Sequence, residues 1–181
     1  VVTTHLMSGF LTTVIIWLMY FKMKDIENPT RAPWNFNINT KRLINLSLVV
    51  VVIQIFLGAW TSTNYASIAC ADLPLCRGQL LPPADFAAGF NFFQNIGPNY
   101  LGGLLSDEAR VAIHLIHRFG SIIVTLVLSS LIFVLFRQRL LKVAVGLAGA
   151  LALQIALGIS NVVFSLPLLV AVGHNLGGLL L

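Results

Sequence analysis

The sequence predicts an all-α protein, a bundle of helices that crosses a membrane several times. Two observations predict this fold. Hydrophobic residues make up 57% of the 181 residues and charged residues only 9%, which is far from the balance of a soluble domain. The apolar residues also gather in runs close to the roughly 20 residues that a helix needs to cross the hydrocarbon core.

The runs define about five predicted transmembrane helices. They lie near residues 1–21, 43–60, 111–136 and 143–164, and the last begins near residue 169. The first run starts at Val1 without a Met, a charged flank or a signal-peptide pattern. The last run stops at Leu181 while it is still apolar. We therefore interpret the chain as cut at both ends, with its last helix truncated.

Basic residues between the runs predict the orientation in the membrane. The segments 22–42 and 137–142 hold five and three Lys and Arg residues, so the positive-inside rule places both in the cytoplasm. The segment 61–110 holds two basic and four acidic residues and is predicted to face outward. Because the basic residues lie in short segments rather than along one exposed face, the net charge of +5 reflects this orientation, and no nucleic-acid partner is expected.

The two cysteines of the chain, Cys70 and Cys76, lie in this outer segment. A bacterial periplasm, or an equivalent oxidising compartment, would favour a disulfide between them. Two unpaired thiols are the alternative.

Three histidines lie near the outer ends of apolar runs: His5, His117 and His174. Polar residues within a span are costly and usually face a bundle interior or a bound group. Haem iron needs only one or two axial ligands and an apolar pocket, whereas zinc would need more Cys, His or carboxylate ligands. The apolar runs contain no Asp or Glu, so the pattern favours haem. The alternative is that these histidines bond to neighbouring helices.

Two neighbours of His117 extend this candidate site. His114 lies three residues earlier, hence on the same helical face, and only one of the two histidines need be a ligand. Arg118 is costly inside a membrane, and a haem propionate would be a natural partner for it. Its alternative is to extend to lipid phosphate at the outer interface.

Two internal repeats indicate that the protein is built from repeated helix units. Residues 153–158 resemble residues 53–58, and residues 171–178 around His174 resemble residues 2–9 around His5. The first pair contains a Gln and ends in a Gly. We interpret it as helix packing, since Gly permits close approach and Gln can hydrogen-bond across the contact.

Several motifs in combination resemble the haem A synthase family of proteobacteria and mitochondria. They lie at residues 58–66, 69–79, 98–103, 112–120, 157–164 and 170–178. The resemblance implies an eight-helix bundle made of two four-helix halves, of which this chain would hold the fourth to eighth helices. Residues 1–21 would then be the last helix of the N-terminal half and residues 22–42 a cytoplasmic linker. Residues 43–181 would be the C-terminal half, with the external loop 61–110.

The resemblance also implies roles for individual residues. His117 and His174 would be the ligands of haem b iron, and His5 a ligand of the substrate haem iron. His114, which takes the place of a reactive glutamate of the first half, and Arg118 would line the haem b site. That glutamate itself would lie upstream of Val1. The cysteine pair matches a pair of the family that is often disulfide-bonded.

The function implied is that of an oxidoreductase in the bacterial or mitochondrial inner membrane. The family oxidises a methyl group of haem O to a formyl group, which gives haem A for terminal oxidases. Haem O synthase and an electron donor are the implied protein partners, besides membrane lipid. The chain alone, with half of a substrate site, is predicted to be inactive. The alternatives are a bis-histidine membrane cytochrome b and a membrane assembly protein without haem.

Overall fold

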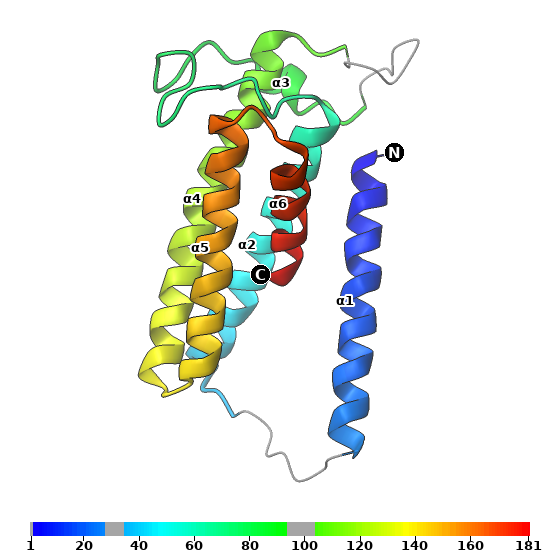
Figure 1. The fold of residues 1–181 in the computed structure, drawn as a ribbon, viewed down its shortest axis with the longest axis vertical. Helices are drawn as coiled ribbons and strands as arrows, with labels where there is room; N and C mark the ends of the chain where they lie inside the picture. The colour runs from blue at the N-terminus through cyan, green and yellow to red at the C-terminus, as the bar shows by residue number, and fades with distance from the viewer. Residues whose placement is uncertain (1, 28–34, 94–103) are drawn as a thin grey trace.

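The computed structural model describes residues 2–27, 35–93 and 104–181 (Figure 1). The helices in these ranges are α1 (Val2–Glu27), α2 (Ile38–Thr63), α3 (Phe86–Gly89), α4 (Asp107–Arg137), α5 (Leu141–Val163) and α6 (Leu168–Leu180). The same ranges hold no strand beyond an isolated bridge between Cys76 and Gln79. The predicted all-α fold is thereby confirmed. Val1, the part of the predicted linker that contains Arg31, and the 98–103 motif lie outside the described residues.

Four of the helices are long and apolar enough to cross a membrane, namely α1, α2, α4 and α5. They match the first four predicted runs, and the fifth run corresponds to α6, a shorter apolar helix of 13 residues. The helices extend beyond the apolar runs at their polar ends, because a helix that has started gains one hydrogen bond for each further residue. α1, for example, continues to Glu27. The chain is therefore an integral membrane protein.

α2, α4, α5 and α6 form one bundle, with α1 beside it (Figure 1). Within the bundle α2 packs against α4, α4 against α5 and α5 against α6, while α1 contacts α2. We call the end at which α2 stops and α4 starts the loop end, and the end at which α4 stops and α5 starts the turn end. At the loop end, the hydroxyls of Thr3 and Thr63 join α1 to α2 at 2.9 Å.

Polar side chains cap the starts of α2 and α4. Oδ1 of Asn37 accepts a hydrogen bond from the backbone N–H of Thr40 at 2.8 Å, and Ser106 does the same for Ala109 at 3.2 Å. Each bond satisfies one of the N–H groups that a helix start leaves unpaired. The acidic residues in the first turn of α4 are also favoured by the helix dipole. Capping explains why α4 begins before the apolar run predicted from residue 111.

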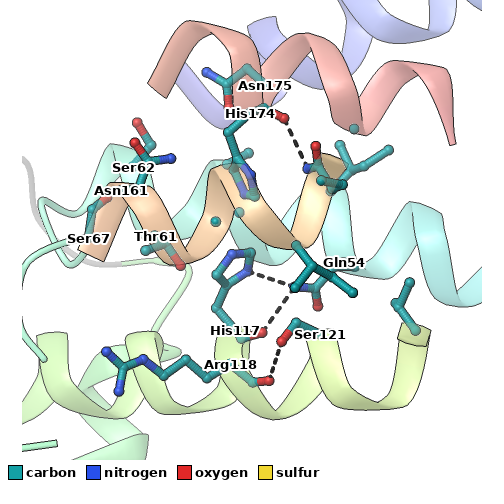
Figure 2. Close-up of a pocket in the computed structure, with 18 of the residues that line it drawn as sticks. Gln54, Thr61, Ser62, Ser67, His117, Arg118, Ser121, Asn161, His174 and Asn175 are labelled. Carbon is teal, nitrogen blue, oxygen red and sulfur yellow. Dashed lines mark hydrogen bonds between the residues drawn. The ribbon is translucent and has the colours of Figure 1, made fainter. Parts of the chain in front are cut away.

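Apolar side chains of α2, α4 and α5 hold the middle of the bundle together. The buried cluster here consists of Val51, Val124, Leu128 and Leu151. A second cluster continues it toward the turn end, with Leu131, Leu135 and Ala144. Between this core and the loop end the helices enclose a cavity (Figure 2).

At the loop end, α3 packs against the start of α4. The indole of Trp60, on α2, donates a hydrogen bond to the backbone carbonyl of Gly89 at 2.9 Å, and the ring of Phe92 lies 4.9 Å from the Trp60 ring. Gly89 is required for this approach, because a Cβ there would lie 2.7 Å from the carbonyl oxygen of Ala109. The segment therefore fixes the loop ends of α2 and α4 relative to each other.

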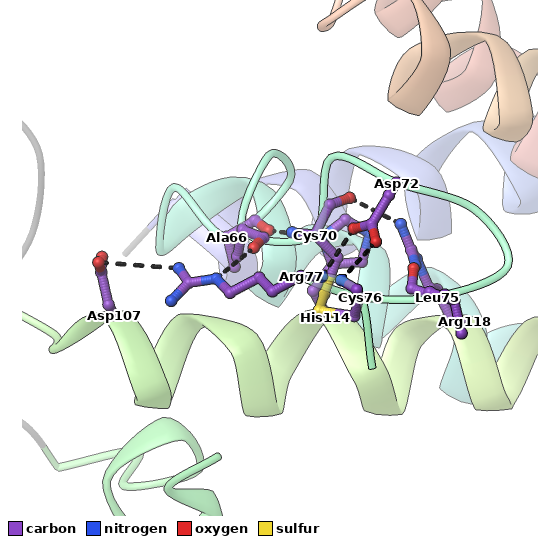
Figure 3. The surroundings of a disulfide bond; sticks show 11 residues. Ala66, Cys70, Asp72, Leu75, Cys76, Arg77, Asp107, His114 and Arg118 are labelled. Carbon is purple, nitrogen blue, oxygen red and sulfur yellow. Dashed lines mark hydrogen bonds and ion pairs between the residues drawn. A yellow bond between two sulfur atoms is a disulfide. The ribbon is translucent and has the colours of Figure 1, made fainter. Parts of the chain in front are cut away.

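The segment between α2 and α3 is closed by the predicted disulfide, Cys70–Cys76 (Figure 3). Both cysteines are buried. Inside the disulfide ring, the carboxylate of Asp72 accepts hydrogen bonds from the backbone N–H groups of Arg77 at 2.7 Å and Gly78 at 2.8 Å. We call residues 70–78 the cysteine loop.

These bonds change the acidity of Asp72. The N–H of Gly78, with a smaller contribution from that of Arg77, stabilises the carboxylate and holds the pKa of Asp72 below its ordinary value of 3.8. Because the pKa in the folded protein is lower than in the unfolded chain, the stabilisation is present above pH 3.8. It is lost as the pH falls through the lower folded pKa.

Gly89→Ala should destabilise the full-length protein by about 1–3 kcal/mol, because the new methyl group meets backbone atoms that side-chain rotation cannot move. The measurement is the midpoint of thermal unfolding in detergent, followed by circular dichroism. Gly149→Ala is the control, since a Cβ at Gly149 meets nothing within 4 Å and Ala favours helix. Equal midpoints for the two variants would contradict the close packing of α3 on α4.

Asp72→Asn should lower the unfolding midpoint of the full-length protein at pH 7, because an amide oxygen replaces the carboxylate that accepts two N–H groups. The difference from wild type should shrink as the pH falls below 3.8 and the wild-type carboxylate is protonated. The check is a series of thermal melts between pH 7 and pH 3. Asp25→Asn, on the exposed turn-end part of α1, is the control. A difference in unfolding midpoint between wild type and Asp72→Asn that stays constant over this pH range would disprove that the charge of Asp72 stabilises the fold.

Candidate functional site

The cavity has a volume of about 290 Å³ and lies between α2, α4, α5 and α6. Leu6 and Phe10 of α1 also reach it. Many of its lining side chains are apolar, among them Val51, Ile55 and Leu151. Polar side chains enter it mainly from four helices, and His114, His117, Arg118, Gln54, Gln154, Asn161 and His174 are among them. An apolar cavity with a few convergent polar groups is typical of a small-molecule or cofactor site.

His117 and His174 enter the cavity from two different helices. His117 is on α4 and His174 on α6, and Figure 2 shows their imidazole rings pointing toward each other. A glycine of a neighbouring helix makes room for each ring. A Cβ at Gly58 would lie 3.2 Å from Cε1 of His117, and one at Gly158 would lie 3.1 Å from Cε1 of His174. The sequence prediction named both histidines, and the structure brings them together.

A glutamine contacts the backbone of each of these histidines. Nε2 of Gln54 donates a hydrogen bond to the carbonyl oxygen of His117 at 3.0 Å, and Nε2 of Gln154 donates to that of His174 at 3.0 Å. Nε2 of Gln54 also lies 3.1 Å from Nδ1 of His117. Nδ1 of His174 is buried and has no partner among the described residues. Because an amide nitrogen can only donate, the contact with His117 is a hydrogen bond only while Nδ1 of that ring is unprotonated.

His114 lies deeper in the protein than the other two and connects α4 to the outer segment. It is only 3% exposed. Its Nδ1 lies 2.9 Å from the carbonyl oxygen of Ala66 and 3.4 Å from the backbone nitrogen of Cys70. One nitrogen of a neutral ring cannot both donate and accept. We assign the shorter contact as the bond, with Nδ1–H donating to Ala66.

Arg118 fastens the cysteine loop to α4 (Figure 3). Its Nη1 donates to the carbonyl oxygen of Leu75 at 2.9 Å and its Nη2 to that of Cys70 at 2.7 Å. The side chain also lines the cavity, and its Nε is buried without a partner among the described residues. The sequence analysis expected a haem propionate or a lipid phosphate as the partner of Arg118. In the structure its partners are backbone carbonyls of the cysteine loop, which the sequence analysis did not consider.

His5 is on α1 and does not line this cavity. Its side chain is exposed, although its neighbour Leu6 reaches the cavity edge. The structure therefore brings together His114, His117, Arg118 and His174 and leaves His5 outside the group.

Some cavity residues escaped the sequence reasoning. It assigned Gln54 and Gln154 to helix packing and did not connect them with the histidines. It overlooked Thr61, Asn161 and Asn175, which line the cavity near its loop end. Their position at the outer ends of apolar runs is the signal that could have found them, since polar residues there usually face a bundle interior.

Comparisons with known proteins identify the family of this chain. Residues 1–181 match the model of the COX15-CtaA family, described as cytochrome oxidase assembly protein. The chain is 40% identical over 185 aligned residues to Heme A synthase of Shewanella oneidensis, an alignment that covers 100% of this chain and 54% of that protein. It is 26% identical over 183 residues to Heme A synthase of Erythrobacter litoralis, covering 99% of this chain and 48% of the relative.

Heme A synthase of Wolbachia pipientis wMel is 25% identical over 166 residues, which cover 91% of this chain and 43% of that protein. The chain thus spans about half the length of the curated relatives it matches. No solved structure matches the chain. The family match extends over the whole chain and confirms the resemblance carried by the sequence motifs, so the chain belongs to the COX15-CtaA family.

Proposed function

We propose that the complete protein oxidises a methyl group of haem O to the formyl group of haem A, and that the cavity described above holds a haem b. The observation that carries this proposal is the pair His117 and His174, which face one apolar cavity from two helices. The proposed reaction is based on the relatives named Heme A synthase, one of which is 40% identical to this chain.

The residues of the cavity fit a haem. Its walls are largely apolar, as a macrocycle requires. Two imidazoles are the axial ligands of many membrane cytochromes. The buried Nδ1 of His174 and Oδ1 of Asn161, which have no partner among the described residues, need an explanation, and a polar or metal-bearing group in the cavity would supply one.

A haem b held by His117 and His174 would supply one-electron transfer. The residues of this chain then have distinct roles. His117 and His174 provide the imidazoles, while Gly58 and Gly158 leave room for them. Arg118 holds the cysteine loop over the outer part of the cavity, which limits the entry of water.

His5 belongs, in this proposal, to a second site that binds the substrate haem O. Its exposed position on α1, outside the haem b cavity, supports this separation. α1 would be the last helix of the N-terminal half, and residues 43–181 the haem b half. The reactive glutamate would precede Val1. Haem O synthase and an electron donor are the proposed partners.

The basic residues support an inner-membrane orientation with the cysteine loop outside. Lys22 and Lys24 lie in the last part of α1, and Arg137, Arg139 and Lys142 lie at the turn between α4 and α5. All five are at the turn end of the bundle, opposite the cysteine loop (Figure 1). The positive-inside rule then puts the turn end in the cytoplasm or its mitochondrial equivalent and the loop end in the periplasm or its equivalent.

His117→Met or His174→Leu should abolish the bis-histidine haem b spectrum of the purified full-length protein, because each removes one axial ligand. His5→Leu is the matched control: it should keep that spectrum and lose haem A formation. The measurements are the reduced-minus-oxidised optical spectrum and the low-temperature paramagnetic resonance signal. A normal bis-histidine spectrum in both cavity variants would refute the ligand assignment.

Cells that produce haem O and carry the full-length gene should accumulate haem A, as measured by chromatography of extracted haems. The 181-residue chain alone should give none, because its proposed substrate site is incomplete. A haem b spectrum without haem A would instead indicate a membrane cytochrome b. Purified protein without a Soret band would indicate an assembly protein that binds no haem.

A further inference from the structure

The same arrangement of four residues occurs twice in the bundle. α2 and α4 carry the first copy and α5 and α6 the second. In each copy a Gln side chain of one helix donates a hydrogen bond to the backbone carbonyl of a His on the other, at 3.0 Å in both cases. Figure 2 shows the imidazoles of His117 and His174 pointing toward each other, and both line the cavity. We call the two copies the Gln–His pairs, Gln54–His117 and Gln154–His174.

Glycines on both helices make each pair possible. Gly58 and Gly158 lie four residues after the glutamines, and a Cβ at either would press on the imidazole of the paired histidine, at 3.2 Å and 3.1 Å from Cε1. Gly120 and Gly177 lie three residues after the histidines. A Cβ at either would overlap Oε1 of the paired glutamine. One helix of each pair therefore carries the pattern Q-x-x-x-G and the other the pattern H-x-x-G. The glycine of the first helix leaves space for the histidine, and the glycine of the second leaves space for the glutamine.

Packing alone does not explain the glutamines. Oε1 of Gln54 and of Gln154 is buried without a hydrogen-bond partner among the described residues, which is costly in an apolar bundle. An apolar side chain of similar length would fill the same space without that cost. What the glutamine adds is a donor to the backbone carbonyl of a histidine whose side chain lines the cavity. A local cost of this kind is typical of functional positions.

We propose that Gln54 and Gln154 are positioning residues, each of which fixes the height and rotation of its histidine relative to the cavity so that the two imidazoles stay opposed. That the group between the imidazoles is haem iron rests on the proposed function. The pairing itself rests on the hydrogen bonds and glycines of the structure.

The test uses the full-length protein with Gln54→Met and Gln154→Met, which keep the length of the side chain and remove the donor. Gln138→Met is the matched control. The Gln138 amide donates to the hydroxyl of Thr40 at 2.8 Å, so this substitution removes a hydrogen bond between the same two helices, α4 and α2, at the turn end. A merely structural role would make all three variants alike.

With haem bound, Gln54→Met and Gln154→Met should retain the cofactor but shift the g-values and the midpoint potential of haem b. Both should lose haem to a scavenger protein about fivefold faster, the factor expected for one hydrogen bond. Gln138→Met should match wild type. Unchanged g-values, potential and haem loss in both cavity variants would overturn the proposal, as would equal changes in all three.

A second readout does not depend on haem. Protein purified from haem-deficient cells is treated with diethylpyrocarbonate, and the modification rate of each histidine is followed by mass spectrometry. Gln54→Met should accelerate modification of His117 alone, and Gln154→Met that of His174 alone. If the wild type carries no bis-histidine haem but this crossed pattern is found, the proposed function fails and the pairing stands. If the wild-type spectrum is normal and no variant alters these rates, the pairing fails and the proposed function stands.

Discussion

The interior of a membrane bundle offers no water to polar groups, so each polar side chain there must find a partner within the protein or in a bound group. The two Gln–His pairs meet this constraint through Nε2 of each glutamine, while Oε1 is left without a partner among the described residues. Nε2 of Gln54 and of Gln154 donates to the backbone carbonyl of the paired histidine, and both imidazoles line the cavity. The packing of α2 on α4 and of α5 on α6 follows from these contacts, because the four glycines beside them let the helix backbones approach closely.

The loop end shows the same constraint in a different form. The polar side chains of His114 and Arg118 on α4 would be costly there without partners. His114 bonds to the carbonyl oxygen of Ala66, and Arg118 to those of Cys70 and Leu75. Because these two residues lie on either side of His117, the cysteine loop is attached to the helix turn that carries a proposed iron ligand.

Much of the site could be predicted from the sequence. Hydropathy located the helices because the hydrocarbon core imposes a length and an apolar composition on each span. His117 and His174 stood out since a histidine is rare and costly at that depth. The hydrogen bonds from the glutamines to the backbone carbonyls could not be predicted. Helix periodicity shows on which face of its helix a residue lies, but not which other helix packs against that face. The cavity residues Asn161 and Asn175 could have been predicted from their position at the ends of apolar runs.

The sequence by itself determined the helical fold and the position of the apolar helices, because the hydrocarbon core of a membrane requires apolar runs of a certain length. Only the tertiary structure decided how the histidines and Arg118 combine. His117 and His174 share a cavity while His5 lies outside it, and Arg118 bonds to the loop backbone. These outcomes depend on contacts between helices far apart in sequence. The glycines permit these contacts because they have no side chain at the point of approach. Helix periodicity does not predict which side chain of another helix lies there.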